Sequence, residues 1–294
     1  MNIVDEIKDS FKKGSHLTRM IYINIAVFLL INIFAIFLHL FSKNDLLYDA
    51  ISFLAVPAEF SGLASKPWTL ITYMFFHKDF FHLLFNLLWL YWFGKLFIEY
   101  IDEKRFLNVY LLGGLSGGAF FILSYNFFPG LKENLHGAIA LGASASVMAV
   151  VVAIAAYVPQ HKIYIVFIGP VRIAYIALAG FILSSVVDFS VNTGGKIAHI
   201  GGALMGYFFA MQYKEGRDVT QWFGRILDTI FVFFRSTGKK NMKVSYKKPA
   251  TDIEYNSLKL EQQKEIDRIL DKISGKGYNS LSKEEKEILF KSGK

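Results

Sequence analysis

The sequence predicts an all-α membrane protein, built from a bundle of six transmembrane helices and a cytoplasmic C-terminal tail. Hydrophobic residues make up 53% of the 294 residues and charged residues only 19%, whereas soluble domains carry about 25% charged residues. Long uncharged stretches also recur along the chain. The first, at residues 20–41, has 22 residues without a charge, which as a helix would extend roughly 33 Å and cross the hydrocarbon core of a bilayer.

Six stretches have the composition expected of membrane spans. Five of them contain no Lys, Arg, Asp or Glu, and the second contains only Lys95 near its end. The sixth contains His199. The predicted spans cover residues 20–41, 80–98, 106–128, 138–158, 173–187 and 197–213. The fifth is short, but an apolar stretch precedes it.

The distribution of charge sets the expected orientation. From Lys214 onward there are 18 Lys and Arg residues against 12 Asp and Glu residues, and basic residues accumulate on the cytoplasmic side of membrane proteins. Because six spans place both termini on one side, we expect both in the cytoplasm. The first apolar stretch is long and no cleavage pattern follows it, so it is expected to be an anchor rather than a signal peptide. These features favour a bacterial inner (plasma) membrane.

The spans divide the chain into four segments. We expect a cytoplasmic N-terminal segment at residues 1–19, the six-span domain at 20–213, an amphipathic interfacial helix with a polar linker at 214–262, and a small two-helix module at 263–294. Within the domain, the long connection at 42–79 predicts short helices lying in the outer leaflet.

The last two segments carry local helix signals. An amphipathic pattern typical of a helix at the inner membrane surface follows the sixth span. Its apolar residues are Trp222, Phe223, Ile226, Leu227, Ile230, Phe231 and Phe234. In the module, Gly275 and Gly277 can end one helix, and Ser282 and Glu285 have capping-box spacing before the next. The module is either a small folded appendix or a tail that docks a partner or senses lipid.

Composition narrows the partners and cofactors. The absence of cysteine excludes disulfides, cysteine nucleophiles and Cys-based zinc sites. Most of the net charge of +8 lies in the tail, where anionic lipid headgroups are the expected partner. The sequence has no basic stripe with interleaved aromatic residues, so we expect no nucleic acid. The sequence carries no signal for a cofactor, so we expect none, and it carries no signal for an oligomeric state.

A serine-rich segment, residues 142–146 (Gly-Ala-Ser-Ala-Ser), lies at the outer end of the fourth span. Small residues allow helices to pack closely and a hydroxyl can bond its own backbone, so packing alone would explain the pattern. The alternative is that Ser144 is a nucleophile at a helix N-terminus. There, unpaired N–H groups and the helix dipole can help to hold an oxyanion.

A histidine, His199, lies at the outer end of the sixth span. Ionisable groups inside membrane spans are functional candidates by default. Ala198, Gly202 and Gly206 are spaced by four residues, a row that lets the sixth span approach a neighbouring helix closely. If that neighbour is the fourth span, His199 can take the proton of Ser144.

Two polar residues on the second span, His82 and Asn86, are four residues apart and therefore lie on one helical face. They are either donors for an oxyanion or a hydrogen-bonded pair between helices. His77 precedes them by five residues. A metal site built from the three histidines is a weaker alternative, because Asp79 is the only carboxylate that could complete it.

Together these groups resemble the motifs of the rhomboid family of intramembrane serine proteases. The family patterns are H-x4-H-x3-N, G-x-S-G and A-H-x-x-G. The matching residues are His77, His82 and Asn86, then Gly142 to Ala145, then Ala198, His199 and Gly202. The order of the motifs and the spans that carry them agree with the family. The resemblance covers about residues 17–213 and leaves the tail unexplained.

The resemblance implies a six-helix protease with a Ser–His dyad and no metal. Ser144 would be the nucleophile and His199 the general base, while His82, Asn86 and the backbone N–H of Ser144 would bind the oxyanion. Substrates would be single-span membrane proteins that enter laterally past the fifth span. They would have to unwind locally, because a hydrogen-bonded helix hides its carbonyls.

By the same resemblance four residues support the site without reacting: His77, Trp68, Gly142 and Gly202. Two positions close to Ser144 depart from the family pattern, and Thr69 departs in the first outer loop, where an arginine is frequent. Ala145 stands where a glycine is usual, and its methyl could crowd the oxyanion. Met148 stands where many members have a tyrosine that stacks on the histidine, although methionine can also pack on an imidazole.

Two other classes of function compete with the protease. The nearest is a rhomboid-like protein that binds membrane clients without cutting them, but such proteins typically lack the serine or the histidine, and this chain has both. A transporter or channel would show charges deep in several spans or broken helices in inverted repeats. The one interruption, residues 169–170, lies at a predicted loop boundary.

Overall fold

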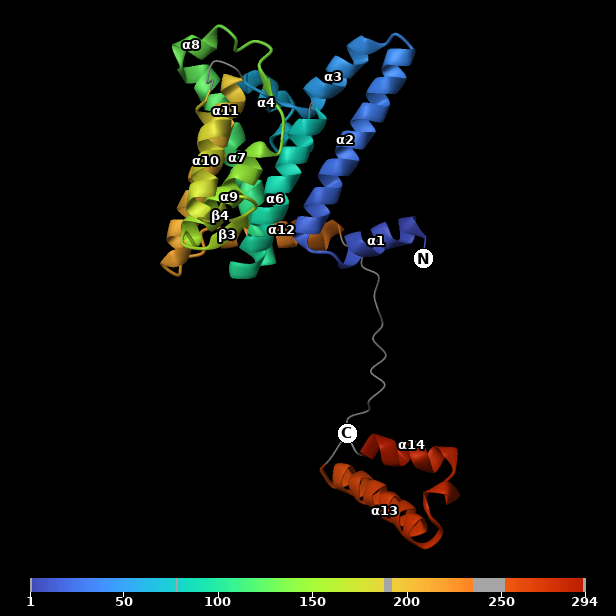
Figure 1. The fold of residues 1–294 in the computed structure, drawn as a ribbon. Helices are drawn as coiled ribbons and strands as arrows, with labels where there is room; N and C mark the ends of the chain where they lie inside the picture. Colours follow the sequence, from blue (N-terminus) through green and yellow to red (C-terminus); the bar gives the residue numbers. More distant parts are fainter. Residues whose placement is uncertain (1, 78, 188–191, 235–251, 293–294) are drawn as a thin grey trace. The chain divides into compact units, whose positions relative to one another are not determined.

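The computed structural model describes residues 2–77, 79–187, 192–234 and 252–292. It divides into two compact units, Met1–Arg235 and Ser236–Lys294 (Figure 1). Parts of the expected linker (236–251) and of the expected loop at 188–196 lie outside the described residues.

The first unit is mainly helical. Its helices are α1 (Ile3–Lys13), α2 (His16–Leu40), α3 (Asn44–Leu54), α4 (Phe60–Ser65), α5 (Thr69–Thr72), the 3-10 helix η1 (Tyr73–Phe75), α6 (Phe80–Tyr100), α7 (Glu103–Phe127), α8 (Pro129–Lys132), α9 (Ser144–Tyr157), α10 (Ile173–Ser185), α11 (Thr193–Lys214) and α12 (Gln221–Phe234). In Figure 1, α1 and α12 lie at one end of this unit, and α3, α4 and α8 lie at the other.

Within the described residues, α2, α6 and α7 are long and apolar enough to cross a membrane. Their length and composition identify a membrane protein. Helices α9 and α10 are apolar but shorter, with 14 and 13 residues, and α11 has 22 residues. The six-span count therefore stays a prediction for the last three helices.

The expected fourth span is wrong at its start, because the helix begins at Ser144 rather than at residue 138. Gly137 and Gly142 have φ values of 87° and 127°, which a right-handed helix does not contain. Between them, β2 (Ile139–Ala140) pairs antiparallel with β1 (Val56–Pro57). This pairing holds the segment before Ser144 extended.

The apolar stretch before the fifth span also differs from a helical extension. It forms a hairpin of β3 (Lys162–Ile165) and β4 (Gly169–Arg172), in which Lys162 pairs with Arg172. A short apolar run fits a strand as well as a helix, so periodicity does not separate the two. The expectation of short helices at 42–79 is confirmed by α3, α4 and α5, and the helix expected after the sixth span is α12.

Helix α9 lies at the centre of the first unit, and most of its residues are buried. A Cβ added at Gly113 or Gly117 of α7 would collide with the methyls of Ala149 and Ala145, respectively. The glycines at these two positions therefore allow the close packing of α7 on α9. Contact distance between α7 and α9 is set by glycine on one helix and alanine on the other.

The other side of α9 packs even more closely against α11. A Cβ at Gly202 would collide with the carbonyl oxygen of Ala145, and a Cβ at Gly206 would collide with that of Ala149. The row of small residues expected on the sixth span therefore packs directly against the backbone of α9, because its glycines have no side chain in between. This contact brings α11, which carries His199, against the N-terminal turn of α9, which carries Ser144.

The second unit contains α13 (Asp252–Lys276), the 3-10 helix η2 (Tyr278–Ser280) and α14 (Lys283–Ser292). Helix α13 begins inside the segment expected to be a linker, which corrects that boundary. It ends before Gly277, whose φ is 74°, as the glycine signal predicts. The capping box is present, since the Ser282 N–H donates to Glu285 (2.7 Å) and the Glu285 N–H donates to the Ser282 hydroxyl (3.3 Å).

Candidate active site

The structure brings Ser144 and His199 together although 55 residues separate them in the chain. The Oγ of Ser144 lies 2.7 Å from Nε2 of His199, the distance of a hydrogen bond between a nucleophile and a base. Ser144 is the first residue of α9, so its backbone N–H is among those with no acceptor inside the helix. His199 lies in the second turn of α11.

The second ring nitrogen of His199 has a partner that the sequence did not predict. Nδ1 lies 3.2 Å from the backbone carbonyl oxygen of Ser184. A carbonyl can only accept a hydrogen bond, so Nδ1 carries the proton and Nε2 is left to accept from Ser144. The carbonyl of Ser184 therefore orients the imidazole and selects its tautomer, a role that a carboxylate has in triads.

The position of Ser184 in α10 explains why its carbonyl is free. Ser184 lies one residue before the end of the helix at Ser185. The last carbonyls of a helix accept no hydrogen bond from an N–H group of the same helix. To predict this contact from the sequence, the exact last residue of the fifth span would have been needed. The fifth span was expected to continue to residue 187, which would have placed Ser184 inside it.

Gly142 controls how closely His82 approaches the segment before Ser144. Its φ is 127°, and its N–H donates to the Tyr73 carbonyl at 2.9 Å. A Cβ at this position would lie 2.9 Å from Cε1 of His82 and 3.7 Å from Oγ of Ser144. Only glycine combines this backbone conformation with this close contact.

His82 and Asn86 line one cavity together with Ser144 and His199, which confirms that the two residues share a helical face. The cavity has a volume of about 370 Å³. Its other lining residues are Phe85, Trp89, Val147, Met148, Val151, Gly180, Leu183 and Ser184. One N–H of the Asn86 amide donates to the His82 carbonyl at 2.9 Å, so the second N–H remains for a group in the cavity.

His77 lies outside this cavity, behind His82. The two rings meet edge to face with their centroids 5.2 Å apart. Burial, together with the neighbouring His82, lowers the pKa of His77 to about 4, so the His77 ring is neutral near pH 7. Neither of its ring nitrogens has a hydrogen-bond partner among the described residues. Its contact with His82 fits a supporting position.

The remaining expected residues lie in different surroundings. Trp68 does not line the cavity; its indole N–H donates to the Phe53 carbonyl at 2.8 Å and holds the end of α3 against α5. Gly202 packs on the backbone of Ala145, as described above. Asp79 caps α6 by accepting from the His82 N–H at 2.8 Å, so this carboxylate has a structural role.

The two departures from the family pattern close to Ser144 can now be located. The methyl of Ala145 is buried and faces Gly117 of α7, so it lies on the packing side of α9. The prediction that this methyl could crowd an oxyanion therefore has no support in its surroundings. Met148 lines the cavity together with His199.

Comparison with known proteins adds two family matches. The Rhomboid domain matches residues 64–215, and a family of unknown function (DUF6576) matches residues 250–291. The chain is 28% identical over 159 residues to RHOMBOID-like protein 12, mitochondrial, of Arabidopsis thaliana, covering 51% of this chain and 47% of that protein. It is 26% identical over 164 residues to the human presenilin-associated rhomboid-like protein, mitochondrial, covering 53% and 40%.

The chain thus spans less than half the length of these relatives. Their names assign them to mitochondria, and the expectation of a bacterial inner membrane finds no support in these similarities.

Proposed function

The chain belongs to the rhomboid family, whose domain matches more than half of it, and from this premise we propose that it is a serine endopeptidase that cuts other membrane proteins within or beside the bilayer. The observation that carries the proposal is the 2.7 Å contact between Ser144 Oγ and His199 Nε2. It joins a nucleophile and a base at the wall of a cavity, with the base oriented from its far side.

The reaction follows from these contacts. His199 Nε2 takes the proton of Ser144 as the oxygen attacks the carbonyl carbon of the scissile peptide bond. The C–N bond then breaks, the amine leaves with the proton from Nε2, and the substrate's acyl group remains on Ser144. Water, deprotonated by the same nitrogen, then attacks the acyl carbon. The bond to Ser144 breaks, Nε2 returns the proton to Ser144, and the substrate's new carboxyl end is released. The Ser184 carbonyl stabilises the transient imidazolium through Nδ1–H.

Three donors are proposed to bind the oxyanion of the tetrahedral intermediate. The backbone N–H of Ser144 is unpaired at the start of α9, and the second N–H of Asn86 and a ring N–H of His82 can point into the same cavity. Donors that are already in place when charge develops give the largest catalytic benefit, typically 10²–10³-fold for each one.

The proposed substrates are single-span membrane proteins that reach Ser144 from the side. The cavity lies between α6 and α10, because its walls include Phe85 and Trp89 of the former and Gly180 and Leu183 of the latter. We further propose that α9, α10 and α11 complete six spans, with both termini on the cytoplasmic side. A chain that binds membrane clients without cutting them is the second candidate.

Labelling with a fluorophosphonate tests the reaction proposed for Ser144. The purified protein in detergent should form a covalent adduct, and mass spectrometry of its peptides should place the adduct on Ser144. A preformed donor–acceptor pair predicts labelling without any substrate. Ser146→Ala should label as the wild type does. No adduct on a folded protein would favour the client-binding candidate, and an adduct on Ser146 would show that the nucleophile is wrongly assigned.

Replacing Gly142 with alanine should separate the oxyanion donor from the nucleophile. The added methyl would push the His82 ring away from the Ser144 segment, because it would lie 2.9 Å from Cε1. Loss of one oxyanion donor predicts a decrease in kcat of about 10²–10³-fold. Cleavage of a single-span substrate, measured by gel densitometry, checks this. Fluorophosphonate labelling at Ser144 should persist at a reduced rate.

Gly137→Ala is the matched control. Gly137 also has a positive φ, 87°, but nothing lies within 4 Å of an added Cβ. Both variants carry the backbone cost of alanine at positive φ, about 1–3 kcal/mol, and only Gly142→Ala adds the contact with His82. Equal losses of activity in the two variants would contradict the role given to His82.

A further inference from the structure

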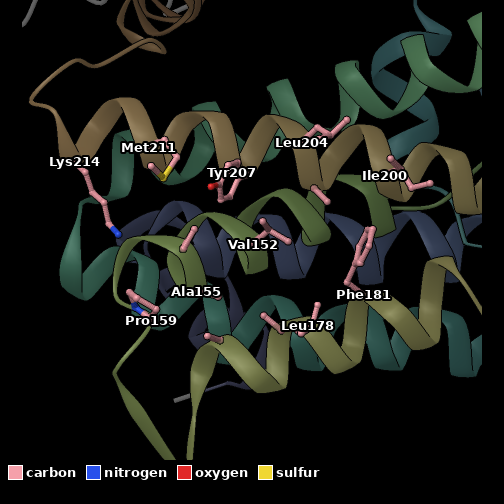
Figure 2. A pocket seen from close by; sticks show the side chains of 14 residues that line it. Val152, Ala155, Pro159, Leu178, Phe181, Ile200, Leu204, Tyr207, Met211 and Lys214 are labelled. Carbon is pink, nitrogen blue, oxygen red and sulfur yellow. The ribbon is translucent and has the colours of Figure 1, made fainter.

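We propose that a groove between α9, α10 and α11 binds one acyl chain of an anionic phospholipid, with the lipid phosphate beside Lys214. This groove is separate from the catalytic cavity: no residue lines both. It has a volume of about 580 Å³. Figure 2 shows its side chains, with Lys214 at one end and Phe181 and Ile200 at the other.

The walls of the groove are apolar and largely small. Alanines from all three helices leave the space between them open. They are Ala155 and Ala156 of α9, Ala174 and Ala177 of α10, and Ala203 of α11. Leu178, Leu204 and Met211 form the rim. Apart from the Tyr207 hydroxyl, the side chains between the two ends of the groove offer a hydrocarbon chain dispersion contacts rather than hydrogen bonds.

The length of the groove fits a lipid chain. Ile200 and Lys214 are 14 residues apart on the α11 wall, about 21 Å at 1.5 Å per residue. This length exceeds the depth of one leaflet of the hydrocarbon core, about 15 Å, so the groove can accommodate the whole acyl chain of a lipid in one leaflet.

The positive charge of Lys214 favours a lipid with an anionic headgroup. Among the described residues that line the groove, Lys214 is the only charged one, and it lies at the end of α11. None of the ion pairs within the described part of the chain includes it. Arg172 precedes α10 at the same end. An amine at the mouth of an apolar groove is complementary to a phosphate whose acyl chain lies inside.

The opposite end of the groove lies next to the residues that orient His199. Ile200 follows His199 in α11, and Phe181 is three residues before Ser184 in α10. A chain filling the groove would therefore brace α10 at the position from which the Ser184 carbonyl holds the imidazole. This consequence rests on the proposed function, whereas the binding experiment below does not depend on activity.

Photo-crosslinking in vesicles tests the site. The full chain with p-benzoylphenylalanine in place of Leu204 is reconstituted in phosphatidylcholine containing a minor fraction of phosphatidylglycerol, irradiated and analysed by mass spectrometry. Leu204 lines the groove and is 50% exposed. We expect adducts enriched in phosphatidylglycerol relative to the vesicle. Lys214→Gln should lower that enrichment about fivefold, the effect of one basic residue on anionic lipid binding.

Ile33 of α2 provides the control position, because it is 64% exposed and lies outside the groove. Its adducts should have the composition of the vesicle, with or without Lys214. Equal lipid composition at both positions would overturn the proposal, as would an enrichment at residue 204 that survives Lys214→Gln. A protein–protein adduct at residue 204 would instead assign the groove to a second copy of the chain.

Discussion

Replacing Ser144 with alanine should lower the rate of cleavage of a single-span membrane substrate by about 10⁴-fold or more. When a nucleophile and its base act as one unit, removing either of them abolishes nearly all covalent catalysis. His199→Ala should have a similar effect, since Nε2 is the proposed acceptor for the Ser144 proton at 2.7 Å. The double variant should be no slower than either single variant. Initial rates in detergent at saturating substrate measure all three.

Ser146→Ala is the matched control for this experiment. Ser146 lies two residues further along the same helix, but its hydroxyl is buried, unpaired among the described residues and directed toward Gly114 of α7. Removing an unpaired buried hydroxyl should leave the rate unchanged and the fold at least as stable. A large loss in Ser146→Ala, or cleavage that survives in Ser144→Ala, would show that the serine is wrongly assigned.

The residues that meet at the candidate site could be predicted because polar groups are rare in apolar spans. Ser144, His199, His82 and Asn86 stood out on that ground, and the cavity brings all four together. The close approach of α11 to a neighbouring helix could also be predicted from the sequence, since small residues spaced by four indicate close helix contacts. Gly202 and Gly206 make that contact with backbone carbonyls of α9.

Other parts of the site depend on backbone atoms, which residue types do not specify. The Ser184 carbonyl acts through its place at a helix end, and a shift of the helix end by two residues would hide it. The segment before Ser144 is apolar enough for a helix, yet strand pairing with Val56 and Pro57 and the positive φ of Gly142 keep it extended. Its conformation depends on partners far away in the sequence.

For Trp68 the resemblance predicted a supporting role, and its contacts lie away from the cavity. Its indole donates to the Phe53 carbonyl and its ring packs on Phe53 with centroids 4.9 Å apart. These contacts join α3 to α5 at the end of the unit. Position in a family pattern therefore does not by itself distinguish a residue that faces the cavity from one that holds the surrounding helices.

Gly202→Val should destabilise the first unit by about 3 kcal/mol or more, the upper range for overpacking a core. A Cβ at Gly202 would collide with the carbonyl oxygen of Ala145, and no rotamer change relieves a contact with backbone. Helices α9 and α11 would have to separate, which would also pull His199 away from Ser144. We expect a lower unfolding midpoint in detergent, measured by tryptophan fluorescence, together with loss of fluorophosphonate labelling.

Ala203→Val separates this effect from a general sensitivity of α11 to β-branched residues. Ala203 is the next residue on the helix and is also buried, but it lines the apolar groove beside α10, so two added methyls would extend toward the groove rather than into the backbone of α9. The helical cost of valine over alanine is at most about 0.7 kcal/mol, so its unfolding midpoint should stay near that of the wild type. If the two variants unfold alike, the close contact between α9 and α11 does not control stability. If only Gly202→Val unfolds early, glycine at this position is needed because the backbone of α9 occupies the place of a side chain.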